Sequence, residues 1–79
     1  MIRLNFNVLE DGILEARVPN GCYAIFPTNN SCFAVNGHVN DTTIEVGNLP
    51  NLYEALDAAN VHYNRRLLLE IQEQDAARS

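Results

Sequence analysis

The spacing of apolar residues changes once along this chain of 79 residues, and that change restricts the fold more than any other feature. Up to about Val46 the apolar residues alternate with polar ones or form short β-rich runs separated by Gly, Asn and Asp. From Leu52 onward they recur every three or four residues, which is typical of a helix rather than a strand. The sequence therefore predicts one α+β domain over residues 1–79. An antiparallel meander of four to five strands (residues 1–48) packs against one long C-terminal helix (within residues 49–77).

The first expected hairpin covers residues 2–18 and turns at residues 10–12. A two-residue loop would place Phe6 opposite Arg17, whereas a three-residue loop with Gly12 in the left-handed conformation collects the apolar side chains on one face. We therefore expect the three-residue loop and a hairpin that is buried on one side only. The pairs expected in this register are Val8 with Leu14, Phe6 with Ala16, and Leu4 with Val18.

The second expected hairpin covers residues 22–35 and is apolar on both faces. A turn centred on Asn29-Asn30 would pair Phe26 with Phe33 and Ala24 with Val35. A sheet with two apolar faces needs cover on both, and this chain has only one helix to supply it. We therefore predict a self-association surface on the second face, formed by Tyr23, Ile25 and Ala34.

Two tight-turn signals follow the second hairpin. Asn36-Gly37 and Asn40-Asp41 are both dipeptides that favour left-handed backbone, so each predicts a turn. Residues 42–46 then form the last expected strand, with Ile44 and Val46 directed inward.

The helix has a recognisable start and one clear core face. Asn51 and Glu54 have the spacing of a capping box, so we expect the helix to begin near Leu52 and to end near Ala76. At 100° per residue, one stripe about 120° wide meets the requirement for packing on the sheet. Its members are Leu52, Ala55, Leu56, Ala59, Tyr63 and Leu67.

A second stripe on the helix mixes large apolar side chains with amides. Packing on the sheet does not require it, and residues 67–69 make the helix apolar on nearly all sides at that turn. Either these are scattered surface residues or they form a surface for a protein partner, and we favour the partner surface. The predicted partner-binding residues are Tyr53, Asp57, Asn60, Val61, Asn64, Leu68 and Ile71.

The charge balance restricts the class of partner. Ten acidic residues stand against five basic ones, and a net charge of −5 argues against direct binding of nucleic acid. The same charge suits docking on a basic surface, including the nucleic-acid channel of another protein. No apolar run approaches the length of a membrane span, and the first residues lack the apolar core of a signal peptide, so we expect a cytoplasmic protein without membrane contact.

The sequence contains no recognisable constellation for catalysis. Neither His38 nor His62 has further metal ligands or a nucleophile at a suitable spacing, and Cys22 and Cys32 lack a CxxC arrangement. The glycines lie in isolated turns rather than in a phosphate-binding loop. We therefore predict no enzymatic activity and no catalytic, cofactor-binding or metal-binding residues.

The order of these segments resembles a group of known proteins. A compact acidic chain that carries the meander segments Cys22-Tyr23-Ala24-Ile25-Phe26 and Ser31-Cys32-Phe33-Ala34-Val35-Asn36-Gly37, and then a helix from Leu49-Pro50-Asn51, looks like small phage-encoded inhibitors of the anti-CRISPR type. The resemblance is architectural and carries no functional residues over. It implies a stoichiometric inhibitor that binds a bacterial defence complex in the host cytoplasm and blocks target-DNA binding or nuclease recruitment.

A second hypothesis remains open from the residues alone. The chain would then be a homo-oligomeric structural module, or one that sequesters a small ligand without catalysis. A homodimer would cover the surplus apolar surface on the sheet or on the helix, and a small domain would gain stability from that association.

Overall fold

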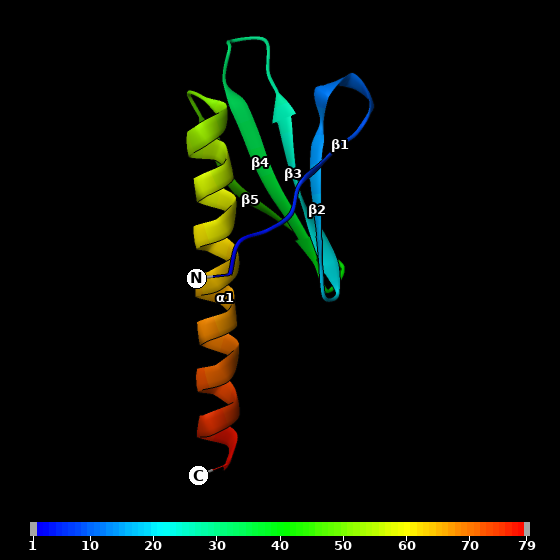
Figure 1. Cartoon of the computed structure of the whole chain (residues 1–79). Helices are drawn as coiled ribbons and strands as arrows, with labels where there is room; N and C mark the ends of the chain where they lie inside the picture. The colour runs from blue at the N-terminus through cyan, green and yellow to red at the C-terminus, as the bar shows by residue number, and fades with distance from the viewer. Residues whose placement is uncertain (1, 79) are drawn as a thin grey trace.

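The structure, a computed structural model, describes the backbone of residues 2–78 and the side chains of residues 2–72. Figure 1 shows a twisted sheet with one long helix, α1 (Leu52–Arg78), against one of its faces. The five strands are antiparallel and adjacent in chain order, which confirms the predicted meander followed by a helix. The strands are β1 (Asn7–Val8), β2 (Leu14–Val18), β3 (Gly21–Pro27), β4 (Phe33–Val39) and β5 (Thr42–Leu49).

The first hairpin has the predicted loop and register but is much shorter than expected. Val8 pairs with Leu14 around the short 3-10 turn η1 (Glu10–Gly12), and the Leu9 N–H donates to the Ile13 carbonyl at 2.7 Å. The expected pairs of Phe6 with Ala16 and of Leu4 with Val18 do not form, because β1 contains only two residues. The chain before Asn7 instead leaves β2 and crosses to α1 (Figure 1).

The predicted register of the second hairpin is wrong by one residue. Phe26 pairs with Ala34 and Ile25 with Val35, around a three-residue loop in which Ser31 is left-handed with φ 59°. A slip of one residue moves every side chain of a strand to the other face of the sheet. Tyr23 and Ile25 are consequently buried beneath α1, while Ala34 lies on the opposite, uncovered face. The predicted self-association surface of Tyr23, Ile25 and Ala34 therefore does not exist.

The turn expected at Asn36-Gly37 is also wrong, since both residues lie within β4. Gly37 pairs with Tyr23, and a Cβ atom at Gly37 would lie 3.0 Å from the Tyr23 ring. The glycine therefore makes room for an aromatic ring on the neighbouring strand. The turn expected at Asn40-Asp41 does form, with φ values of 53° and 64°.

The core lies between the sheet and the first half of α1. The Glu54 N–H donates to the Asn51 side-chain oxygen at 2.9 Å, so Asn51 caps the helix where the sequence predicts its start. Ala55 and Ala59 of the predicted core stripe are fully buried, and these small side chains allow α1 to lie close to the sheet. They form one core cluster with four buried residues of the sheet: Tyr23, Ile25, Val35 and Val39.

The second half of α1 extends beyond the sheet. A helix of 27 residues is about 40 Å long, whereas the eight residues of β5 span about 27 Å. In Figure 1 the orange and red part of α1 accordingly continues past the end of every strand. None of the helical residues described here forms a segment long and apolar enough to cross a membrane.

Candidate binding surface

The described residues hold no cluster of side chains suited to binding a metal ion. Residues 2–72 contain no cluster of three or more His, Cys, Asp or Glu side chains that could hold a metal ion. Cys22 and Cys32 are free thiols at opposite ends of the β3–β4 hairpin: Cys22 pairs with His38, and Cys32 adjoins the loop.

His62 has a structural contact that the sequence did not reveal. Its Nδ1 lies 2.7 Å from the hydroxyl of the buried Tyr23, and the two rings meet edge to face with centroids 5.6 Å apart. Burial lowers the pKa of His62, and the charges of Arg66 and Arg65 lower it further. Burial also raises the pKa of Tyr23. The hydrogen bond between the imidazole and the tyrosine hydroxyl thus joins α1 to the sheet.

Asn60 and Asn64, two of the predicted partner-binding residues, fasten the N-terminal segment to α1. The Oδ1 atom of Asn60 accepts the Leu4 N–H at 2.6 Å, and that of Asn64 accepts the Ile2 N–H at 2.9 Å. The Asn64 amide also donates to the Ile2 carbonyl at 2.7 Å. Both side chains lie one turn apart on the helix, so they satisfy successive backbone groups of an extended strand-like segment. Their amides serve this intramolecular contact.

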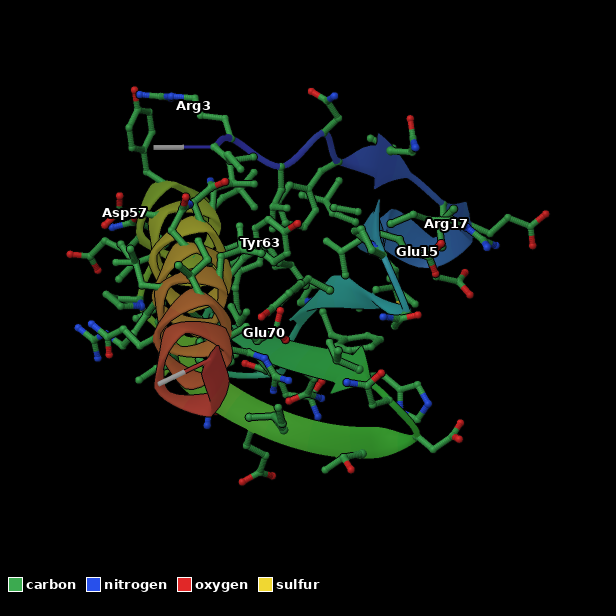
Figure 2. All side chains as sticks on the ribbon, turned by 90° about the horizontal axis from the view of Figure 1, so that it is seen from below. Arg3, Glu15, Arg17, Asp57, Tyr63 and Glu70 are labelled. Carbon is green, nitrogen blue, oxygen red and sulfur yellow. The ribbon has the colours of Figure 1, made fainter. Side chains whose placement is uncertain are left out.

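The docked segment divides the predicted partner stripe into two parts. Toward the start of α1 lies a groove of about 570 Å³ that includes Tyr53 and Asp57. Tyr53 is 87 % exposed, the most exposed of the large apolar and aromatic side chains described. Figure 2 shows Asp57 on the side of α1 turned away from the sheet, and Arg3 reaching from the N-terminal segment across the same side. The lining consists of Arg3, Tyr53, Glu54, Leu56, Asp57 and Asn60.

The charges around this groove have no ion-pair partner among residues 2–72. Among residues 2–72 the single ion pair joins Arg17 to Glu15 at 3.7 Å, and both lie on the sheet, far from the groove (Figure 2). Arg3, Glu54 and Asp57 are all exposed. The groove thus places an exposed aromatic ring beside charges that no described residue pairs with.

The other part of the stripe lies where α1 extends beyond the sheet. Leu68 and Ile71 are 61 % and 55 % exposed, and Leu69 on the adjacent side of the helix is 54 % exposed. Val61, between the two parts, is half-buried. The stripe predicted as one partner surface is therefore two surfaces, the Tyr53 groove and the Leu68–Ile71 seam, separated by the docked N-terminal segment.

Arg3 is the lining residue that the sequence did not single out. The sequence predicts that residues 2–6 form a strand paired with β2. Arg3 would then lie on the sheet, far from Tyr53. The available signal was the pair Asn60 and Asn64, four residues apart on a helix, which can bind an extended backbone.

The uncovered face of the sheet is flatter and more mixed. His38 Nδ1 lies 3.1 Å from the Thr43 hydroxyl across the β4–β5 pair, and Glu15 and Arg17 form their ion pair on β2. The centre of this face carries half-buried residues: Cys22, Ala24, Phe26, Ala34 and Asn36.

Comparison of the chain with protein-family models, with curated proteins and with solved structures found no match.

Proposed function

We propose that this protein is a non-enzymatic inhibitor that acts by binding another protein through the Tyr53 groove. The observation that carries the proposal is the 87 % exposure of Tyr53 in a groove of about 570 Å³, beside charges that form no ion pair with any residue of the described part of the chain. Tyrosine is among the residues that contribute most to protein interfaces, because it covers a large area at a small cost in conformational entropy. A tyrosine ring that is exposed to water buries little apolar area and so adds little to the stability of the fold.

The acidic residues of the groove favour a basic partner. Glu54 and Asp57 lie on the same side of α1 as Tyr53, one turn or less away, and the chain has a net charge of −5. An arginine or lysine of a partner that entered the groove would stack on the ring and pair with a carboxylate. Arg3, on the opposite wall, would contact an acidic or carbonyl oxygen of the same partner.

Basic surfaces of this kind are typical of complexes that bind nucleic acid. An acidic protein seated on such a surface would compete with phosphate groups for the same arginines and lysines. Together with the resemblance to small phage-encoded inhibitors, this supports stoichiometric inhibition of a bacterial defence complex of the CRISPR-Cas type. The protein would act in the host cytoplasm, without a cofactor and without contacting DNA itself.

The test measures target-DNA binding by purified CRISPR effector complexes, each loaded with guide RNA, in the presence of increasing amounts of this protein. Inhibition that saturates near one protein per complex supports the proposal. Tyr53→Ala and Asp57→Lys should each weaken inhibition at least tenfold. Val8→Ala is the matched control, because Val8 is 75 % exposed on β1 and lies outside the groove. Inhibition that survives both groove substitutions would show that the groove is not the binding site.

A phage plaque assay on cells that carry the inhibited system provides a second readout. Expression of the intact protein should restore plaques of a targeted phage, and expression of Tyr53→Ala should not. Circular dichroism of each variant should match that of the unsubstituted protein, since both side chains are exposed. If none of the effector complexes is inhibited, the proposed function is wrong.

A further inference from the structure

The uncovered face of the sheet places Cys22 between a histidine and an arginine. Cys22 on β3 is level with Arg17 on β2 and with His38 on β4. Directly opposite residues of antiparallel strands point to the same face of the sheet, with Cβ atoms about 4.5–5.5 Å apart. The thiol therefore has an imidazole on one side and a guanidinium on the other, although neither residue is close to Cys22 in the sequence.

The imidazole of His38 is supported by the next strand. Thr43 on β5 is the residue opposite His38, and its hydroxyl lies 3.1 Å from His38 Nδ1. When that hydroxyl accepts the Nδ1 proton, Nε2 keeps its lone pair and can act as a base. Cys22, His38 and Thr43 thus form a row of a thiol, a base and a third group that orients the base, as an activated nucleophile requires.

The charged residues nearest to Cys22 in the strand pairing lie on β2. Arg17 Nε is 3.7 Å from Glu15 Oε1, and Figure 2 shows both side chains on the side of the sheet remote from α1. Glu15 is level with Ala24, so Arg17 is the nearer of the two to the thiol. A guanidinium attracts the negative charge of a sulfur that has lost its proton. Ala24 has only a methyl group, which leaves room beside the thiol for an attached group.

We propose that Cys22 is a modification site that reacts with low-molecular-weight disulfides. His38 takes the thiol proton, directly or through one water, and the Cys22 sulfur attacks one sulfur of the disulfide. A bond forms between these two sulfurs and the S–S bond of the reagent breaks. The leaving sulfur takes the bonding electron pair and then the proton from His38. Cys22 is thereby oxidised to a mixed disulfide, and the other half of the reagent is reduced to a free thiol.

Cys32 provides a comparison within the same molecule. It is also a half-buried free thiol, but it adjoins the hairpin loop. There the N–H and the hydroxyl of Thr28 donate to the Cys32 carbonyl at 2.9 and 3.0 Å. The pairing of β3 with β4 places neither a histidine nor an arginine level with it. We therefore expect Cys32 to react as an ordinary thiol of the same exposure.

The test treats the intact chain with an excess of oxidised glutathione near neutral pH. After quenching in acid, cleavage behind Phe26 separates Cys22 from Cys32, and mass spectrometry follows the mixed disulfide at each. Cys22 should react at least about tenfold faster than Cys32, because a base lies beside it. Equal rates, or faster reaction of Cys32, would overturn the proposal. Cys22 and the Tyr53 groove lie on opposite sides of the molecule, so the result does not depend on the proposed function.

Substitution of His38 tests the base. His38→Gln should lower the rate at Cys22 at least about tenfold and leave the rate at Cys32 unchanged. The side chain of His38 is exposed, so circular dichroism of the variant should match that of the unsubstituted protein. An unchanged rate at Cys22 would overturn the proposal.

Substitution of Thr43 tests the orientation of the base. Thr43→Val removes the hydroxyl and should slow the reaction of Cys22, whereas Thr43→Ser keeps the hydroxyl and should retain the rate. Thr42→Val is the matched control, because Thr42 is an exposed threonine of the same strand that is level with Val39. Its rate should equal that of the unsubstituted protein. Equal rates in Thr43→Val and Thr43→Ser would overturn the proposal.

Discussion

Replacing Asn60 by alanine should release Leu4 from α1, while Asn64 still holds Ile2. The Asn60 side chain accepts the Leu4 N–H at 2.6 Å and donates to the Leu56 carbonyl at 2.8 Å. In the variant the partly buried Leu4 N–H loses its partner, which costs about 1–3 kcal/mol, whereas alanine is favoured over asparagine in a helix by about 0.6 kcal/mol. The free energy of unfolding should therefore fall by about 0.5–2.5 kcal/mol.

Amide hydrogen exchange measures the release directly. In Asn60→Ala the Leu4 amide should exchange at close to the rate of an unstructured peptide, while the amides of Ile25 and Val35, which pair within the core of the sheet, stay protected. Urea denaturation gives the change in the free energy of unfolding. Gln72→Ala is the control, because Gln72 is an exposed amide on the same helix. The reasoning is refuted if the Leu4 amide stays protected in Asn60→Ala, or if Gln72→Ala is equally destabilising.

Two further predictions concern the contacts of Tyr23. Because burial lowers the pKa of His62 below its ordinary value of 6.5, the unfolded chain takes up a proton at a higher pH than the folded one does. The free energy of unfolding should thus fall as the pH drops through 6.5, and urea denaturation of His62→Gln should show less of this loss; an identical pH dependence would count against the contact. Gly37→Ala brings a methyl group to 3.0 Å from the Tyr23 ring and should destabilise the protein by about 1–3 kcal/mol. In Gly47→Ala the added methyl group makes only an ordinary contact at 3.5 Å, so the melting temperature should fall by less than half as much as in Gly37→Ala. Equal falls in the two variants would contradict the argument.

The order of elements follows from local signals and was predictable. The change of apolar spacing separates the sheet from α1, and Asn51 marks the first turn of the helix because its side chain caps Glu54. The register of the first hairpin was also predictable, because glycine at position 12 indicates a left-handed residue at the end of a three-residue loop.

The errors arise where a residue adopts a conformation or a contact that its type does not indicate. Ser31 is left-handed, and nothing in a serine predicts this conformation. The sequence therefore predicted a loop one residue shorter than the one in the structure. Gly37 resembles a turn residue but leaves space for Tyr23, which lies 14 positions earlier in the sequence. Arg3 lines the groove because Leu4 and Ile2 form hydrogen bonds to Asn60 and Asn64, which lie 56 and 62 positions later in the sequence. Patterns of neighbouring residues carry no information on contacts at such sequence separations.

The same hydrogen bonds set an order of events during synthesis. The hairpins of β2, β3, β4 and β5 join neighbouring segments, so they can form while the rest of the chain is still being made. Ile2 must wait until Asn64 has left the ribosome, although it is made among the first residues. Until then Leu4 and Phe6, which pack against the core in the finished fold, have no helix to dock on, and the nascent chain is most exposed to wrong association. Slowing translation between β5 and the middle of α1 would lengthen that interval and should increase aggregation.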